Sequence, residues 1–193
     1  MKNKIVFFDF DYTLAKTTEG VWIWSPRGTR SYKGECYRVV NPLEYNVLSL
    51  GDDEFIDERS FKEFNKINIL DAKPIRFNLM LLNFFMSENV SVFILSARPQ
   101  QVENDVFRFL EKHKIKNHNN ILFKGCASSD PSKKYDYIKE KTLSIKPSEV
   151  FLFDDSKKVI ECAKKFFKKD FSDIEFTACL VSNDKESLCM CFG

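Results

Sequence analysis

Short runs of apolar residues recur along the chain, separated by longer polar or mixed segments. They are rich in β-branched and aromatic residues, and most do not alternate between apolar and polar side chains. Such runs are typical of strands in a parallel sheet that is covered on both faces. Four clear runs and a weaker fifth lie at residues 5–8, 90–95, 150–153, 176–181 and 121–123.

Between these runs, apolar residues recur at the spacing of an α-helix. Residues 74–88, for example, carry Ile75, Leu79, Leu82 and Met86 at intervals that place them on one face. Strands that alternate with helices predict right-handed βαβ units and a three-layer α/β fold with a Rossmann-like parallel sheet. Further helices are expected at residues 99–114, 132–142 and 156–169.

Residues 15–71 break this rhythm. The segment holds both tryptophans of the chain in an apolar run at 21–24, then a turn-like sequence at 25–28 and an acidic one at 51–54. We interpret it as an insert that stands over the sheet: a β-hairpin flap followed by irregular or helical structure. The whole chain, residues 1–193, is then a single domain with a small flap or cap after its first strand.

Composition narrows the classes of function. With 44% hydrophobic and 30% charged residues, the chain is typical of a soluble globular protein. A formal net charge of +2 gives no general attraction to nucleic acid or membrane, and no apolar run approaches the roughly 18 residues of a spanning helix. The chain does not begin like a signal peptide, and its six scattered cysteines favour reduced thiols. We expect a cytoplasmic protein with no membrane partner and no obligate protein partner.

Two carboxylates directly follow the first strand, in the sequence Asp9-Phe-Asp-Tyr-Thr. Asp9 and Asp11 can face one point if the chain coils there, and open α/β sheets bind ligands at the carboxyl ends of their strands. One aspartate can attack phosphorus to form an aspartyl-phosphate, while the other protonates the leaving oxygen and later activates water. Taken alone, however, the pair favours an ordinary surface turn.

Later segments supply partners for such chemistry. Ser96 follows the second long apolar run and can bind a phosphate oxygen, although Ser is also a common helix cap. Lys133 or Lys134, near a helix start, can neutralise charge on a phosphoryl group. Asp154 and Asp155 follow another strand, where adjacent carboxylates repel each other unless a cation lies beside them. Oxygen ligands of this kind suit Mg²⁺.

The order of these motifs resembles that of a known family. Asp-x-Asp-x-Thr after an apolar strand, then Ser, then Lys, then Asp-Asp, is similar to the four motifs of the haloacid dehalogenase-like (HAD) superfamily, over residues 4–165. A narrower likeness is to small HAD-like proteins of bacteriophages, on segments such as 41–45 and 51–55. The resemblance implies a HAD-like fold and a Mg²⁺-dependent phosphatase, in the host cytoplasm if the chain is viral.

The resemblance also implies a role for each matching residue. Asp9 is the nucleophile and Asp11 the general acid/base. Lys134 stabilises the aspartyl-phosphate, and we prefer it to Lys133 because Ile138, four residues on, fits the helix pattern of the family. The implied Mg²⁺ ligands are Asp9, Asp11, Asp154 and Asp155, and the implied substrate contacts are Thr13, Ser96, Ala97 and Arg98.

The insert is expected to lie over the mouth of this site, because it leaves the chain directly after Asp11 and Thr13. Trp24 is a candidate for stacking on a substrate ring, although packing of the flap explains an aromatic residue there at least as well. Arg27 is a candidate for binding a second phosphate or a nucleic-acid backbone.

Three functions stay open on these grounds. The first is a phosphomonoester hydrolase that acts through an aspartyl-phosphate on a phosphorylated small molecule, such as a nucleotide or sugar phosphate, or on a nucleic-acid end. The second is a phosphotransferase, which passes the phosphoryl group to an acceptor other than water. The third is a non-catalytic binding module on a HAD-like scaffold, which the presence of both carboxylates and the lysine disfavours.

Overall fold

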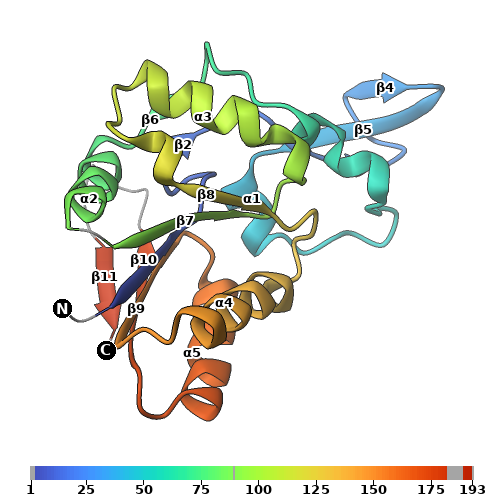
Figure 1. Ribbon diagram of the computed structural model, residues 1–193. Helices are drawn as coiled ribbons and strands as arrows, with labels where there is room; N and C mark the ends of the chain where they lie inside the picture. The colour runs from blue at the N-terminus through green and yellow to red at the C-terminus, as the bar shows by residue number, and fades with distance from the viewer. Residues whose placement is uncertain (1–2, 89, 182–188, 193) are drawn as a thin grey trace.

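A β-sheet forms the middle layer of the computed structural model, which describes residues 3–88, 90–181 and 189–192 (Figure 1). Its strands are β1 (Lys4–Phe8), β7 (Ser91–Ser96), β8 (Leu122–Gly125), β9 (Glu149–Asp154), β10 (Glu175–Val181) and β11 (Cys189–Phe192). Their order is β11-β10-β9-β1-β7-β8, and among the described strands of this sheet only β11 pairs antiparallel to its neighbour. As predicted, β1 is central between β7 and β9, so the ends of these three strands lie side by side.

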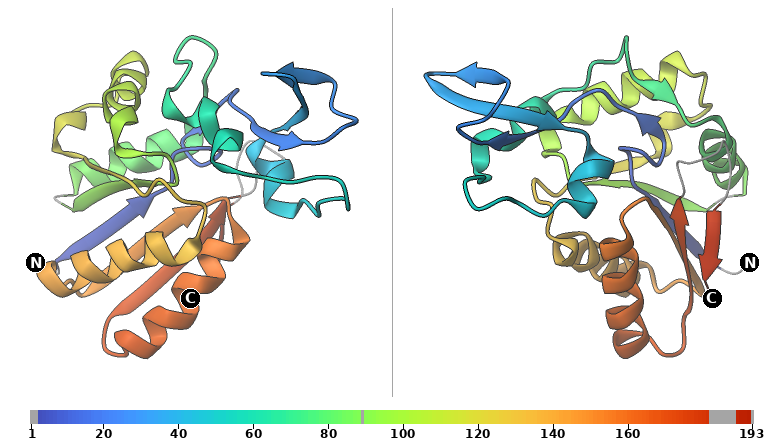
Figure 2. Two further views of the ribbon diagram at one scale, coloured as in Figure 1. Left: turned by 90° about the vertical axis from the view of Figure 1, so that its right-hand side faces the viewer. Right: turned by 180° about the vertical axis from the view of Figure 1, so that it is seen from behind.

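Helices cover both faces of the sheet, as the alternation of strands and helices predicted (Figures 1 and 2). The helices are α2 (Arg76–Ser87), η2 (Gln100–Val102), α3 (Glu103–Lys112), η3 (His118–Asn120), α4 (Pro131–Ile145) and α5 (Lys157–Asp170). The side chains of α2 and α3 pack on one face, and those of α4 and α5 pack on the other. None of the helices in the described ranges is long and apolar enough to cross a membrane.

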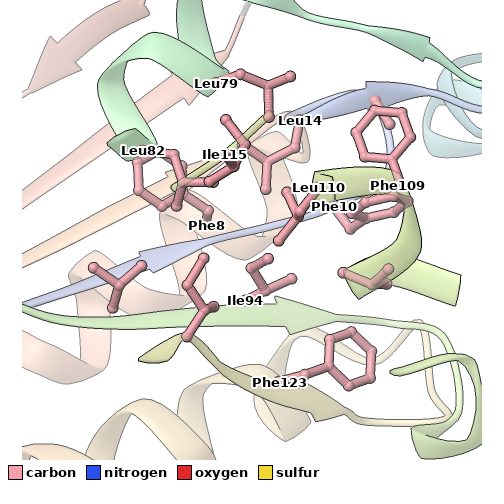
Figure 3. Close-up of a cluster of buried hydrophobic side chains, with 14 of the residues drawn as sticks. Phe8, Phe10, Leu14, Leu79, Leu82, Ile94, Phe109, Leu110, Ile115 and Phe123 are labelled. Atoms are coloured by element: carbon pink, nitrogen blue, oxygen red, sulfur yellow. The ribbon is translucent and has the colours of Figure 1, made fainter. Parts of the chain in front are cut away.

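Both faces of β1 are apolar, which explains why its sequence does not alternate. Phe8 packs with Leu82 of α2 and Ile94 of β7 in the cluster shown in Figure 3. Phe7 points to the opposite face and packs with Ile138 of α4. All of these side chains are fully buried, and each such burial contributes about 1.5–3 kcal/mol. The two clusters hold the strand ends in a fixed plane beneath the site.

The expected helix at 99–114 begins with the 3₁₀ turn η2, and the close approach of β8 explains the position of that turn. A Cβ atom at Gly125 would lie 2.5 Å from the backbone of Pro99 and Gln100, so the contact requires glycine. The Gly125 N–H also donates a hydrogen bond of 2.9 Å to the Gln100 side chain. The start of the helix is therefore fixed to the neighbouring strand end.

Strand β11 was not anticipated from the sequence. It pairs with β10 and extends the sheet at one edge. The thiols of Cys36, Cys126 and Cys162 are free, as expected, but Cys179 on β10 is disulfide-bonded. The expectation of reduced thiols throughout is therefore wrong for Cys179.

The insert after β1 contains two small antiparallel sheets. Its elements are β2 (Ala15–Lys16), β3 (Val21–Trp24), β4 (Arg30–Tyr32), β5 (Glu35–Val40), α1 (Pro42–Val47), η1 (Glu58–Asn65) and β6 (Lys73–Pro74). β2 pairs with β6, so the chain enters and leaves the insert side by side. β3, β5 and β4 form the flap in that order, with a tight turn at Lys33 and Gly34, both at positive φ. The predicted flap, followed by short helical segments, is present.

Candidate active site

The carboxyl ends of the three central strands bring the predicted site residues together. Asp9 directly follows β1, Ser96 ends β7 and Asp154 ends β9. The Asp9 backbone N–H donates a hydrogen bond of 2.8 Å to the carbonyl of Phe153, which continues the strand pairing up to the site. The floor of the site is therefore an extension of the sheet itself.

Lys134 reaches this floor from the first turns of α4. Its Nζ donates hydrogen bonds of 2.7 Å to Asp9 Oδ1 and 2.7 Å to Asp154 Oδ2. All three side chains are buried, whereas Lys133 is exposed. α4 points Lys134 inward because Ile138, one turn later, packs into the core beneath the sheet. Burial alone would lower the pKa of Lys134, but Asp154 and Asp9 outweigh burial and raise it, so the ammonium form is kept.

Asp9, Asp154 and Asp155 form a compact group of carboxylates beside this lysine. Their nearest oxygens lie within 4.8 Å of one another. Burial raises the pKa of Asp9 to about 7, with repulsion from Asp154 and Asp11 adding to the shift and Lys134 opposing it. Burial, followed by repulsion from Asp9 and Asp154, also raises the pKa of Asp155. The single positive charge of Lys134 does not balance the negative charge of three carboxylates. Carboxylate oxygens in this arrangement fit a Mg²⁺ ion.

Asp11 lies in a tight loop after β1. The N–H groups of Leu14 and Ala15 both donate to the carbonyl of Phe10, and Tyr12 takes a left-handed φ of 56°. The loop turns the Asp11 carboxylate towards Arg98, whose Nε and Nη2 donate hydrogen bonds of 2.8 and 2.7 Å to its two oxygens.

These hydrogen bonds set the charge of Asp11. Burial would raise the pKa of Asp11, but the charge of Arg98 and its hydrogen bonds, together with one of 2.6 Å from the Thr17 hydroxyl, lower it. In this conformation Asp11 is therefore held as a carboxylate that accepts hydrogen bonds. This form suits a general base directly, whereas service as an acid requires a proton to reach Asp11.

Arg98 joins the floor of the site to the insert. Besides Asp11, its Nη2 donates a hydrogen bond of 3.0 Å to Glu19, and its Nη1 donates one of 2.8 Å to the carbonyl of Lys66. Its guanidinium carbon lies 4.8 Å from the centre of the Phe64 ring. The side chain is fully buried, so Arg98 holds Asp11 and the base of the insert at once.

Ser96 and Thr13 lie below the site surface. The Ser96 hydroxyl accepts a hydrogen bond of 3.1 Å from the Arg98 backbone N–H, and the side chain has no exposed surface. Thr13 is also fully buried, and its carbonyl accepts a hydrogen bond of 2.6 Å from Asn78. Ala97 alone of the predicted phosphate-binding segment 96–98 lines the open pocket.

A pocket of about 610 Å³ lies over the carboxylates. Its walls come from two sources, the strand ends of the core and the insert. The core contributes Asp9, Asp11, Ala97, Lys134, Asp154 and Asp155. The insert contributes Val21, Tyr45, Ile56, Glu58, Phe61 and Phe64.

Neither Trp24 nor Arg27 is among the described residues that line this pocket. Trp24 is buried, and its Nε1 donates a hydrogen bond of 3.1 Å to Asp57. Trp22 donates in the same way, at 2.6 Å, to Glu63. Both tryptophans thus fasten the flap to η1. Arg27 is largely exposed on the flap and lies 3.5 Å from Asp53.

Sequence reasoning missed the aromatic wall formed by Tyr45, Phe61 and Phe64. The rings of Tyr45 and Phe61 meet edge to face at 5.7 Å, and those of Phe61 and Phe64 lie 6.4 Å apart. The one signal for this wall is the pair of phenylalanines three residues apart in a polar segment, a spacing that shares one face of a helical turn.

The sequence and the fold were compared with those of known proteins. No protein-family model matches the chain, and no curated protein matches it in sequence. Among solved structures, it is similar to the HAD domain of the effector protein Lem4 from Legionella pneumophila, described there as an inactive mutant. The TM-score is 0.53 at 17% sequence identity, over 96% of this chain and 90% of that one.

The order and pairing of the strands, the insert after β1 and this similarity define a HAD-like α/β fold. The buried group of Asp9, Asp154 and Asp155 lies at the edge of the sheet where a HAD catalytic site is expected. At 17% identity the similarity shows the fold alone.

Proposed function

We propose that the protein is a Mg²⁺-dependent phosphomonoester hydrolase that acts through a phosphorylated Asp9. The observation that carries the proposal is the position of the Asp9 carboxylate. It lies at the floor of a pocket, 2.7 Å from the Lys134 ammonium, and within a group of carboxylates that calls for a cation. Nucleophile, positive charge and metal ligands therefore meet at one point.

The reaction takes place in two displacements at phosphorus. An oxygen of the Asp9 carboxylate attacks the phosphorus atom, the bond from phosphorus to the ester oxygen breaks, and the alcohol leaves with a proton that Asp11 has first taken up from water. Water then attacks the same phosphorus and gives a proton to Asp11, the bond to Asp9 breaks, and inorganic phosphate leaves. Lys134 lowers the energy of the negative charge that develops on Asp9 and the phosphoryl oxygens.

Asp9, Asp154 and Asp155 would hold the Mg²⁺ ion, with the backbone of Asp11 as a further candidate ligand. When bound, the ion neutralises phosphoryl charge that Lys134 alone does not balance. The chain itself supplies the positioning, because the strand pairing fixes Asp9 and Asp154, and Arg98 fixes Asp11. We infer that Asp11 acts most readily on esters whose leaving group needs little protonation, since Arg98 holds it as a carboxylate.

A phosphotransferase on the same scaffold is the alternative. The two reactions share the first displacement and differ in the acceptor of the second. The test is to incubate the purified protein with a generic aryl phosphate and Mg²⁺, with and without a molar excess of an alcohol, and to quantify all phosphorus species by ³¹P NMR. We expect inorganic phosphate as the main product, and none in excess chelator. A phosphorylated alcohol as main product supports the transferase, and no turnover of any ester supports a binding module.

A further inference from the structure

The insert side of the pocket is aromatic rather than cationic. Tyr45, Phe61 and Phe64 form a continuous edge of rings, backed by the buried apolar cluster that includes Val21 and Val40. All three rings line the pocket and are partly exposed to it. Phe64 is fixed from behind by the Arg98 guanidinium. An aromatic wall of this kind suits a flat ring packed against it.

The charged groups of the pocket are almost all negative. Among the described residues that line it, Lys134 is the one cation, and both Asp9 and Asp154 accept hydrogen bonds from it. Away from the floor, where Asp9, Asp11, Asp154 and Asp155 lie, the charged lining residues are Asp57, Glu58 and Asp130. A second phosphate on a substrate would meet these carboxylates, of which only Asp57 has a described ion pair, with Arg59, and repulsion between like charges costs free energy at short range.

The arginines of the insert supply no free positive charge to the pocket, because none of them is among its described lining residues and those with a described partner are held in ion pairs. Arg38 forms a two-point ion pair with Glu54 at 2.7 and 2.9 Å. Arg59 binds Asp57 and Glu35. Proteins that bind a nucleic-acid strand neutralise its phosphates with Lys and Arg, and the described lining of this pocket lacks such a set.

From this contrast we propose that the pocket selects small esters with a single phosphate whose alcohol part carries an uncharged aromatic ring. The proposal rests on the proposed hydrolase function and narrows its substrate class. The phosphate lies at the carboxylate floor, and the ring lies against Phe61 and its neighbours. The end of a polynucleotide is disfavoured as a substrate, because its next phosphate falls among the acidic side chains of Asp57, Glu58 and Asp130.

The first test compares three esters of alcohols in the presence of Mg²⁺: benzyl phosphate, glycerol phosphate and a 5′-phosphorylated oligonucleotide. All three have alkyl alcohols as leaving groups, so the need for protonation is similar. We expect kcat/KM for benzyl phosphate to exceed that for glycerol phosphate by roughly tenfold or more, the effect of burying an apolar ring. The oligonucleotide should be the poorest substrate. Equal rates on the first two, or a preference for the oligonucleotide, would overturn the proposal.

Variants test whether the preference for benzyl phosphate comes from the aromatic wall. Phe61→Ala should lose most of the preference for benzyl phosphate and leave glycerol phosphate within about twofold, whereas Phe61→Leu should keep part of it. Phe84→Ala, an exposed phenylalanine on α2, is the matched control and should change neither rate. Loss of rate on all esters alike in Phe61→Ala, with the fold intact, would contradict the assignment.

Glu58→Lys should raise kcat/KM for the oligonucleotide several-fold at low salt, while Glu111→Lys, the same charge change outside the pocket, should not.

A binding measurement separates this proposal from the proposed function. Benzylphosphonate and methylphosphonate cannot be hydrolysed, and calorimetric titration with Mg²⁺ present gives their affinities without turnover. Roughly tenfold tighter binding of benzylphosphonate supports the aromatic wall even if every ester proves inert, in which case only the hydrolase function fails. Equal affinities would reject the aromatic wall even if the protein is an active phosphatase.

Discussion

At the carboxyl ends of β1, β7 and β9, the functional side chains lie on or next to strands, whereas in the insert they come from α1 and the 3₁₀ segment η1. Asp9 and Asp154 are placed by parallel pairing with strands buried on both faces. Phe61 and Tyr45 are placed by side-chain packing, with each other and with the apolar cluster around Val21, Ile23 and Val40 of the flap. The proposed chemistry therefore lies on the regular half of the molecule, and the proposed substrate selection lies on the irregular half.

The two regions also differ in how their charges are used. On the floor, carboxylates outnumber the cation, which is the charge balance that the proposed metal ion would correct. In the insert, charged groups are largely matched in local pairs such as Arg38 with Glu54. Arg98 is the physical link between the regions, since it binds Asp11 below and Glu19 beside it.

The largest effect should follow from the change of Asp9. Asp9→Asn keeps the shape of the side chain but removes the attacking carboxylate, so kcat/KM should fall by more than about a thousandfold. Phosphate release in the presence of Mg²⁺ is the measurement, with circular dichroism to check the fold. Asp136→Asn, an exposed aspartate on α4, is the matched control. A rate close to wild type in Asp9→Asn would remove Asp9 from the mechanism.

Next in size is the loss of the buried ammonium. Lys134→Met should lower kcat/KM by roughly a hundredfold, since one preorganised charge at the phosphoryl group is lost. Lys133→Met, one residue away but exposed, should stay within about twofold of wild type. Steady-state kinetics on both variants decides between the lysines. Similar losses in the two would mean that Lys134 does not have a special position.

The link between the regions is tested by Arg98→Met. It leaves Asp11 and Glu19 buried without their cation, and we expect a loss of about 3–5 kcal/mol in the free energy of unfolding. Urea denaturation measures it. Arg108→Met, an arginine on α3 that is 71% exposed, should cost less than about 0.5 kcal/mol. Equal stability of the two variants would show that Arg98 does not hold the insert to the floor.

A smaller, pH-dependent effect should come from the carboxylate group. Burial raises the pKa of Asp9 from 3.8 to about 7, so between these values the folded state binds a proton that the unfolded state has released. In chelator, this group should therefore lower stability as the pH rises from about 4 to about 7. Mg²⁺ binds the ionised form, so its stabilising effect on Tm should be greater near pH 8 than near pH 5. Calorimetry at both pH values measures it, and a gain that is independent of pH would argue against a metal at these carboxylates.

The smallest effect is expected at Arg27, which the sequence suggested as a phosphate contact. Its side chain is 88% exposed and its guanidinium lies 3.5 Å from Asp53. Arg27→Ala should change the free energy of unfolding by less than about 0.5 kcal/mol and leave kcat/KM for all esters within about twofold. A selective loss on oligonucleotide substrates would place the flap at the site after all.

Much of the floor was predictable from the sequence because strand order and strand ends follow from short apolar runs. The non-alternating run at 5–8 indicates a central strand, and a pair of carboxylates directly after it must lie at the carboxyl edge of the sheet. Helical spacing to Ile138 was enough to favour Lys134 over Lys133. These inferences depend on short continuous apolar runs for the strands and on the 3.6-residue period for the helices.

The role of Arg98 and the nature of the wall were not predictable in the same way. Arg98 was expected at the substrate, but its partners Glu19 and the carbonyl of Lys66 come from a segment without regular period. Trp24 was proposed for stacking, yet the partner that holds it, Asp57, is 33 residues away in the chain. Contacts of this kind depend on the fold of the insert as a whole, which no local pattern specifies.

The central claim, that phosphoryl transfer passes through Asp9, is tested most directly by the stereochemical course at phosphorus. A phosphorothioate ester made chiral with oxygen isotopes would be hydrolysed by the wild-type protein and Mg²⁺ in water of the third isotope. Two displacements, the first by Asp9 and the second by water, each invert the phosphorus centre, so the account predicts thiophosphate with overall retention of configuration. Overall inversion would mean that water attacks the ester directly, and would contradict the account.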